Sequence, residues 1–298
     1  MAIKTVTLTL EGQKYTIPFD PDSGKHKKSI TAPATTSWPS DGHVYKMVVE
    51  VTDMAGNVTT VDSSHDTYGE KMKLRVKEKT APVISVVSPS AGAYLTNNDV
   101  SFSFDITDAE SGVDPETITA ELDEIIITIT KVQITNGYQC TYAGNVDDGL
   151  HILVINASDN DGNKASVKEI SFTVDTVPPT LNITAPEMDF ITNKQNCIIS
   201  GITNDATSGL ASVTVTHNGN IQPDITVLAD GSFSCEVALV KGENVIIVKA
   251  TDKAGKFTTV TRSVIYDPDA PVIISVDVIP NPVGAGESFV VTVEAVDY

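Results

Sequence analysis

The sequence has few of the residues that build disulfide frameworks, aromatic binding platforms or enzyme active sites. Its 298 residues include only 3 cysteines, 1 tryptophan and 5 histidines. An odd cysteine count without a Cys-x-x-Cys pair argues against a disulfide framework and a zinc site. No two histidines stand at a metal-ligand spacing, and no nucleophile-elbow, P-loop or dinucleotide-binding motif is present. We therefore expect no catalytic residues and no enzyme activity.

The three cysteines lie in strand-like runs, at Cys140, Cys197 and Cys235. A free cysteine in such a run is expected to act as a small buried hydrophobic residue. Cys197 and Cys235 fall within one repeat of the chain, so a disulfide between them stays open if their strands are neighbours.

Long apolar runs and an excess of positive charge are also missing. No stretch reaches the ~18 apolar residues of a membrane helix, and the N-terminus alternates instead of forming a signal-peptide core. The net charge is −19; residues 1–79 hold 11 Lys/Arg and 10 Asp/Glu, which leaves −20 for residues 80–298. Such an acidic surface repels phosphate. We expect cytoplasmic synthesis, no membrane insertion and no nucleic-acid partner.

What the chain does contain is a β-sheet composition. Val, Ile and Thr are common, and they favour the pleated strand surface because their Cβ atoms are branched. Hydrophobic residues make up 41% of the sequence, which is enough to fill several small cores. The composition predicts an all-β protein.

A strand–turn–strand unit occurs three times, at residues 42–60, 149–166 and 242–259. Each copy has an alternating apolar strand, an Asp-x-x-Gly turn and a return segment rich in Thr or Ser. Alternation places one face of the strand inward and the other outward. The glycine supplies the positive φ of a tight turn, and the aspartate can accept backbone N–H groups.

Two further repeats mark loops and joints. An acidic turn with Ser-Gly followed by an alternating strand occurs at residues 106–122 and again at 202–219. Pro82, Pro179 and Pro271 stand at corresponding positions of three similar segments. Proline has a fixed φ and no N–H to donate, so it suits a stiff linker that leads into an edge strand.

These motifs together resemble those of tandem bacterial and phage immunoglobulin-like (Big-type) domain proteins, whose members carry the Asp-x-Ala-Gly-Asn hairpin and the Thr-Asp-x-x-Ser-Gly turn. The resemblance implies tandem immunoglobulin-like antiparallel β-sandwiches and no particular activity. The repeats predict Ig-like modules at residues 80–176 and 177–268. Residues 269–298 supply two strands of a further module, too few to fold alone because pieces below ~40 residues bury too little surface. They either belong to a longer array or complete a sheet in a partner.

Residues 1–79 are predicted to form a divergent β-sandwich module. It opens with a hairpin turning at Glu11-Gly12 and continues with a basic loop at Gly24–Lys28. Its neutral charge favours a docking role, although a divergent module without one is an equal alternative. Trp38 is expected in its core; a surface patch with Tyr15 and Tyr45 is the alternative.

Calcium binding is the most specific chemical hypothesis that the sequence offers. Ca²⁺ binds six to eight carboxylate and carbonyl oxygens, which proteins commonly supply from loops, and this chain has acids in its turns and joints. Asp159 and Asp161 begin a calcium-like loop, and Asp252 lies in the corresponding turn of the third hairpin. Asp175, Asp267 and Asp269 lie at joints, where a bound ion would need carboxylates from two modules. The loop lacks the glutamate of an EF-hand at its twelfth position, and the other two hairpins lack a second acid. Asp159, Asp161 and Asp175 are therefore weak calcium candidates, and no other cofactor is expected.

The absences and repeats favour a non-catalytic structural or adhesive protein. We expect it in a phage or phage-tail-like particle, with the first module docking on other particle proteins and the acidic modules projecting to contact cell-surface glycans. The expected location is a virion or extracellular particle. The alternatives are a segment of a bacterial cell-surface adhesin and the accessory modules of a carbohydrate-active enzyme. The sequence identifies neither the ligand nor the copy number.

Overall fold

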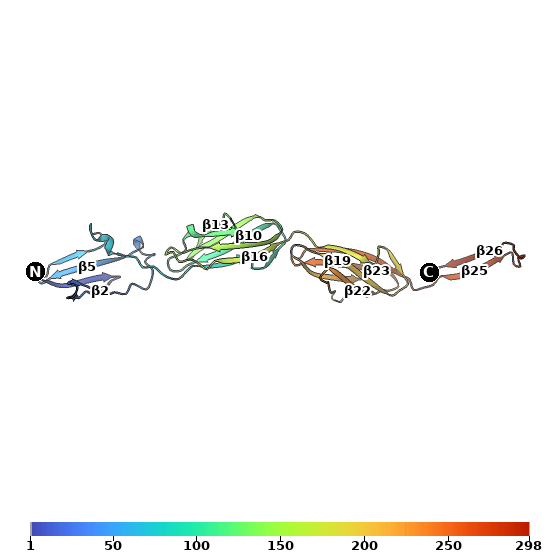
Figure 1. Cartoon of the computed structure of the whole chain (residues 1–298), viewed down its shortest axis with the longest axis horizontal. Helices are drawn as coiled ribbons and strands as arrows, with labels where there is room; N and C mark the ends of the chain where they lie inside the picture. The colour runs from blue at the N-terminus through green and yellow to red at the C-terminus, as the bar shows by residue number, and fades with distance from the viewer. Residues whose placement is uncertain (1, 224, 298) are drawn as a thin grey trace. The chain divides into compact units, whose positions relative to one another are not determined.

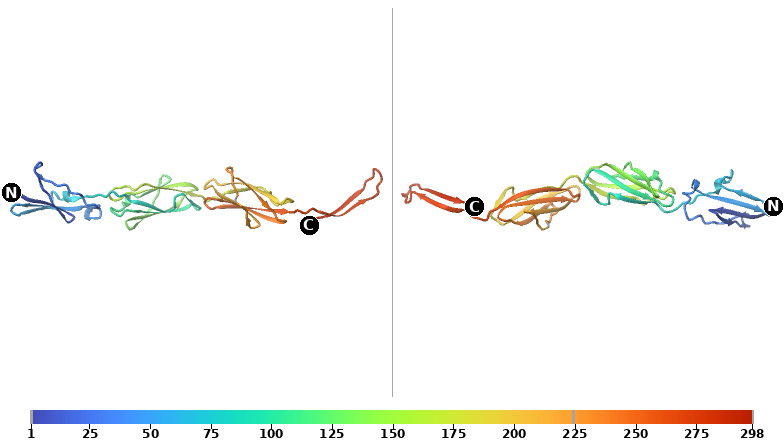
Figure 2. Two further views of the ribbon diagram at one scale, coloured as in Figure 1. Left: turned by 90° about the horizontal axis from the view of Figure 1, so that it is seen from below. Right: turned by 180° about the vertical axis from the view of Figure 1, so that it is seen from behind.

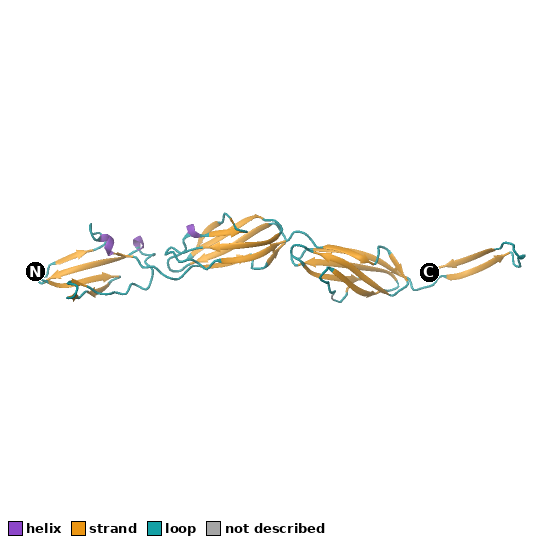
Figure 3. Ribbon diagram, in the orientation of Figure 1, coloured by secondary structure: helices purple, strands orange, loops and turns teal. Residues whose placement is uncertain are grey.

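The described residues form β-strands joined by turns (Figure 1). This computed structural model describes residues 2–223 and 225–297. In that part of the chain, helical structure is limited to three short 3₁₀ turns (Figure 3): η1 Asp41–His43, η2 Gly69–Met72 and η3 Pro115–Thr117. The all-β fold class is confirmed.

The chain folds into two compact units. The first contains Met1–Ala93, Asp99–Asn145 and His151–Phe172, and the second contains Tyr94–Asn98, Val146–Leu150 and Thr173–Tyr298. The module boundaries expected from the repeats stay a prediction.

The first strands of unit 1 form a single five-stranded sheet. Its order is β2-β1-β5-β6, with β7 also paired to β5, and a separate small hairpin joins β3 to β4. The bounds are β1 Ile3–Leu10, β2 Gln13–Thr16, β3 Phe19–Asp20, β4 Lys25–His26, β5 Tyr45–Asp53, β6 Val58–Val61 and β7 Lys73–Leu74. Leu10 pairs with Gln13 across the predicted turn, where Glu11 and Gly12 both have positive φ. The predicted hairpin at Glu11-Gly12 is confirmed.

The next strands form two sheets, seen from two sides in Figure 2. One has the order β13-β14-β10-β8 and the other β12-β11-β15-β16-β9. The bounds are β8 Val83–Ser88, β9 Ala93–Leu95, β10 Asp99–Thr107, β11 Thr119–Leu122, β12 Ile125–Ile126, β13 Thr130–Ile134, β14 Gly137–Asn145, β15 Gly149–Asn156 and β16 Lys168–Val174. The Phe102 ring of β10 meets the Phe172 ring of β16 edge-on, with centroids 5.4 Å apart. The two sheets therefore share one interior.

Unit 2 contains a second pair of sheets around a core of its own. Their orders are β17-β19-β22 and β18-β24-β23-β20-β21, all antiparallel except the β18–β24 pair. The bounds are β17 Thr180–Ala185, β18 Phe190–Thr192, β19 Asn196–Asn204, β20 Leu210–His217, β21 Asn220–Ile221, β22 Ser232–Ala238, β23 Gly242–Asp252 and β24 Phe257–Tyr266. Ile199, Val215 and Ile246 are fully buried in this core. Alternate residues of β19, β20 and β23 point inward, as the sequence pattern predicts.

Two further strands, β25 Val272–Ile279 and β26 Val290–Val296, pair antiparallel as a ribbon. Strands β8, β17 and β25 begin directly after Pro82, Pro179 and Pro271. Both β8 and β17 lie at the edges of their sheets, as expected for strands led by a proline.

The repeated hairpin turn has one backbone conformation in all three copies. Gly56, Gly162 and Gly255 have φ values of 91°, 91° and 93°. Residues with a Cβ avoid this region for steric reasons, which explains why each copy of the repeat has glycine at this position. The strands before these turns end at or near an aspartate, and this places a carboxylate at the same end of each sheet.

Candidate functional site

Carboxylates gather at two places in the described residues, and all of them except Asp205 are buried. Glu78, Asp108 and Asp159 form the first cluster, which we call triad 1 and which lies within unit 1. Asp175, Asp205 and Asp252 form triad 2, which lies within unit 2. In each triad, one oxygen from each side chain lies within 4.8 Å of the others.

Three different segments supply triad 1. Glu78 lies in the segment before β8, Asp108 follows β10, and Asp159 lies in the repeated turn after β15. Asp108 Oδ1 accepts the backbone N–H groups of Glu110, at 3.0 Å, and Gly112, at 2.8 Å. These hydrogen bonds hold the loop and fix the direction of its carboxylate.

The remaining two acids of triad 1 are also fixed by the backbone. Asp159 Oδ1 accepts from the Asn163 backbone N at 2.7 Å, and Asp159 Oδ2 accepts from the Asn163 side-chain amide at 2.7 Å. Glu78 Oε1 accepts from the Ser111 backbone N at 2.6 Å. All three acids of triad 1 are buried, with exposures of 8%, 6% and 2% in chain order.

Two buried polar atoms at triad 1 have no hydrogen-bond partner: Glu78 Oε2 and Ser111 Oγ. Burial raises the pKa of the Glu78 carboxyl above its ordinary value; the charges of Asp108 and Glu110 raise it further, and the hydrogen bond from the Ser111 backbone N lowers it only in part. A buried unpaired oxygen is costly, since nothing replaces its lost water.

Triad 2 is built in the same way. Asp175 Oδ2 accepts from the Ser208 backbone N at 3.1 Å, and Asp205 Oδ1 accepts from the Gly209 backbone N at 2.6 Å. Asp252 Oδ1 accepts from the Lys256 backbone N at 2.9 Å. These three contacts correspond one by one to those of Glu78, Asp108 and Asp159. Both triads are therefore products of the internal repeat.

One residue difference between the second and third hairpins leaves a carboxylate oxygen of triad 2 without a partner. The Asn163 side-chain amide donates to Asp159 Oδ2, and the corresponding residue of the third hairpin is Lys256. Asp252 is 1% exposed, and its Oδ2 has no hydrogen-bond partner. Triad 2 thus also contains a buried carboxylate oxygen without a donor.

No lysine, arginine or histidine among the described residues forms an ion pair with any of the six acids. The nearby Lys77 ammonium donates instead to the backbone carbonyl of Asp161, at 2.6 Å. Three carboxylates at this separation repel one another when all are charged. Their oxygens are the ligand type that a hard divalent cation prefers.

The structure separates the predicted calcium candidates. Asp159 belongs to triad 1 and Asp175 to triad 2, whereas Asp161 belongs to neither. Asp161 Oδ2 accepts from Thr36 Oγ1 at 2.5 Å and from the Glu78 backbone N at 3.0 Å. It anchors the segment that carries Glu78.

Sequence reasoning missed Glu78, Asp108 and Asp205 as members of these sites. It considered acids in the hairpin turns and at the joints after the second and third modules, whereas Asp108 and Asp205 lie in loops after β10 and β19 and Glu78 lies before β8. The signal was in the repeats: Asp205 follows Asp108 by the same interval as Asp175 follows Glu78. Equivalent acids at three positions per repeat would have indicated them.

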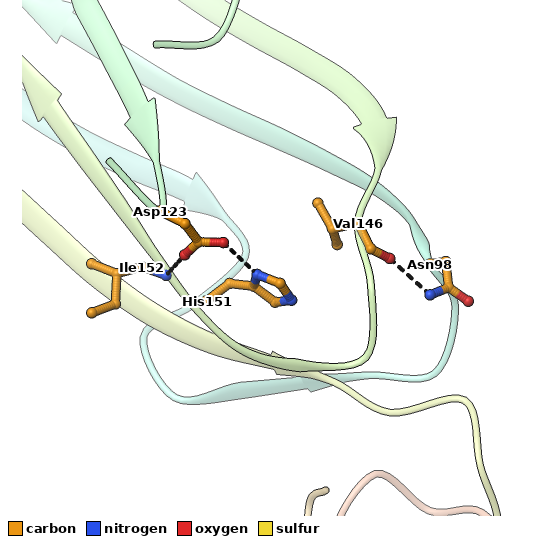
Figure 4. A network of polar contacts seen from close by, with 5 residues as sticks. All are labelled: Asn98, Asp123, Val146, His151 and Ile152. Atoms are coloured by element: carbon orange, nitrogen blue, oxygen red, sulfur yellow. Dashed lines mark hydrogen bonds and ion pairs between the residues drawn. The ribbon is translucent and has the colours of Figure 1, made fainter. Parts of the chain in front are cut away.

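A histidine–aspartate pair in unit 1 has a structural role (Figure 4). His151 Nδ1 lies 2.7 Å from Asp123 Oδ2, and Asp123 Oδ1 accepts from the Ile152 backbone N at 2.9 Å. Asp123 occupies the turn between β11 and β12, so these contacts hold that turn against β15. The Asn98 side-chain amide separately donates to the Val146 carbonyl at 2.7 Å.

The cysteines are all free, and Cys140 and Cys197 are buried as expected. Cys197 pairs with Val237 and Cys235 with Ile199, so the two thiols are diagonal neighbours on adjacent strands. Diagonal side chains lie too far apart for a disulfide, which needs Cβ atoms about 3.5–4.5 Å apart.

The aromatic residues of the first sheet correct two expectations. Trp38 is only half-buried and stacks on the His43 ring with centroids 3.9 Å apart, so it is not a core residue. Tyr45 is buried, and its hydroxyl donates to the Thr36 carbonyl at 2.9 Å. An exposed patch of Trp38, Tyr15 and Tyr45 is therefore not formed.

Sequence comparisons agree with the β-sandwich architecture. The family described as "Bacterial Ig-like domain" matches residues 2–68. The chain is a tandem immunoglobulin-like domain protein. The family described as "Glucodextranase, domain B" matches residues 179–267 of this Ig-like chain. Ig-like modules suggest a structural, adhesive or accessory role.

One curated relative of the tandem Ig-like protein is Bacillopeptidase F of Bacillus subtilis (strain 168). The two are 33% identical over 128 residues, which cover 43% of this chain. The match spans 8% of the length of Bacillopeptidase F.

Several solved structures have a similar arrangement of strands. The Clostridium thermocellum CbhA fibronectin(III)-like modules are 18% identical, with 62% of this chain and 94% of theirs covered and a TM-score of 0.39. A structure from a 1.5-MDa bacterial ice-binding adhesin is 22% identical, with 88% and 86% covered and a TM-score of 0.30. No functional argument rests on likenesses this distant. Among the described residues, no helix has the length and apolar content to cross a membrane.

Proposed function

We propose that this chain is a non-catalytic structural and adhesive array, in which Ig-like sandwiches act as spacers and display surfaces. The observation that carries this proposal is the presence of separate cores, one around Phe102 and Phe172 and another around Ile199, Val215 and Ile246. The acids of triad 1 and triad 2 lie at equivalent positions of the repeat, and backbone N–H groups hold their carboxylates. This arrangement is typical of a structural element. Many displayed copies can turn weak single contacts into useful avidity.

For its setting, we propose an extracellular or particle-borne assembly, with a phage-type particle as the first candidate and a bacterial cell surface as the second. Residues 1–79 would dock on a partner protein through the basic loop Gly24–Lys28. Lys25, Lys27 and Lys28 are exposed near the β3–β4 hairpin, which supports this role. The acidic remainder of the chain would favour projection away from other acidic copies.

The adhesive part is tested with beads that carry the full chain at low and high density. We expect retention on whole bacterial cells to rise steeply with density, because avidity multiplies weak contacts. Beads carrying an unrelated acidic protein are the control. Equal retention of both bead types at every density would contradict an adhesive role.

The match of residues 179–267 to glucodextranase domain B favours a second candidate, the accessory region of a carbohydrate-active enzyme. Affinity electrophoresis of the full chain through gels that contain dextran tests it. Retardation that grows with dextran concentration supports this candidate, and unchanged mobility rejects it.

A further inference from the structure

We propose that triad 1 and triad 2 are two equivalent calcium-binding sites. Glu78, Asp108 and Asp159 would hold one ion, and Asp175, Asp205 and Asp252 the other. This inference rests on the geometry of the acids and does not depend on the adhesive role.

The first argument is the separation of the carboxylate oxygens. Calcium binds oxygen at 2.3–2.6 Å, so two ligands on opposite sides of one ion lie roughly 5 Å apart. The three candidate oxygens of each triad lie within 4.8 Å of one another. A single ion placed among them can therefore reach all three without moving the backbone far.

The second argument is the unpartnered oxygen in each triad. Glu78 is 8% exposed and Asp252 is 1% exposed, and one carboxylate oxygen of each has no hydrogen-bond donor. Backbone N–H groups hold the other oxygen of each side chain. A buried polar atom left this way is rare in folded proteins unless water, an ion or a functional need accounts for it. A cation coordinated by that oxygen would satisfy it.

The third argument is charge. Each triad contains three acids and, among the described residues, no ion-paired base. Buried charges are stable when they are paired or coordinate a metal. A divalent cation leaves a net charge of only −1 at each site. Ser111 Oγ, which is buried and unpartnered, is suited to be a fourth oxygen ligand of triad 1.

The fourth argument is the internal repeat, because its first copy has the same aspartate turn without a cluster of acids around it. Asp53 occupies the same turn as Asp159 and Asp252 in the first hairpin, and its carboxylate accepts from the Asn57 backbone N at 2.9 Å and side-chain amide at 2.8 Å. Within the described residues no two further acids gather around Asp53. The Asx turn alone therefore does not make a site.

The sites would connect segments that are far apart in the sequence. In triad 1 the ion would hold the segment before β8 against the loop after β10 and the turn after β15. In triad 2 it would hold the segment before β17 against the loop before β20 and the turn after β23. Calcium would thus stiffen the proline-led entry to each sandwich.

The experiment is a calcium titration of the full chain after removal of metal with EDTA and desalting. Isothermal titration calorimetry and native mass spectrometry should both give two calcium ions per chain. Asp108→Asn and Asp252→Asn should each bind one ion, because each removes one charge from a different triad. The matched control Asp53→Asn should still bind two.

The proposal is overturned by an absence of binding up to about 10 mM calcium, since extracellular modules bind at roughly 10⁻⁴–10⁻³ M. It is also overturned if Asp108→Asn and Asp252→Asn bind as many ions as the unaltered chain. Circular dichroism checks that each variant is folded. If Asp252→Asn is unfolded, Asp205→Asn replaces it, because Asp205 is less buried.

Discussion

Replacing Phe102 with alanine should destabilise one sandwich and leave the other unaffected. Phe102 is 1% exposed, and its ring lies 5.4 Å from that of Phe172 and 5.2 Å from that of Tyr142. Phe→Ala in a core costs about 3–5 kcal/mol through lost burial and the cavity left behind. The two aromatic contacts contribute about 0.5–1.5 kcal/mol each.

Hydrogen exchange followed by mass spectrometry measures this loss strand by strand. A loss of about 3 kcal/mol raises the population of the open state, and so the exchange rate of core amides, roughly 100-fold or more. We expect this acceleration in β10, β14 and β15 of the Phe102→Ala chain, with β19 and β23 unchanged. Ile246→Ala should give the reverse pattern, because Ile246 is fully buried in the core of unit 2. Acceleration in both sandwiches from either substitution would refute the reasoning.

Two other substitutions or probes test local packing. Gly201→Ala should lower the free energy of unfolding, measured by chemical denaturation, by about 1–3 kcal/mol or more. The added methyl group would lie 2.5 Å from the Asn182 carbonyl oxygen and 2.7 Å from the Phe233 ring. An unchanged free energy of unfolding would contradict this close packing. Burial raises the pKa of the Cys140 thiol to about 11, so its thiolate is scarce at pH 8 and a thiol reagent should modify the half-buried Cys235 first. Modification of Cys140 before Cys235 in the folded chain would contradict that order.

Much of the fold could be predicted from the sequence because it depends on local rules. Alternating apolar residues predicted the inward faces of β15 and β23, whereas most of β5 is half-buried without alternation. The positive φ at Gly56, Gly162 and Gly255 follows from the need for a tight turn at fixed intervals. Prolines marked the positions directly before edge strands β8 and β17, since proline has no N–H to donate to a sheet.

The candidate sites could be predicted only in part, because they depend on contacts between distant segments. Asp159 was recognised from its own turn, but Glu78 reaches it from a segment 81 positions earlier. The different role of Asp161 depends on Thr36, which no local pattern connects to it. The prediction of a core position for Trp38 was also wrong: the first strands form one sheet, and its half-buried ring stacks on the His43 ring.

Single-molecule force spectroscopy of the full chain tests the central claim of separate cores most directly. At roughly 3.6 Å per residue, independent unfolding of residues 80–176 and 177–268 should lengthen the chain by roughly 350 Å and 330 Å, less the folded spans. We predict two separate force peaks with increments near these values. One peak that releases residues 80–268 together, by roughly 680 Å, would contradict the account.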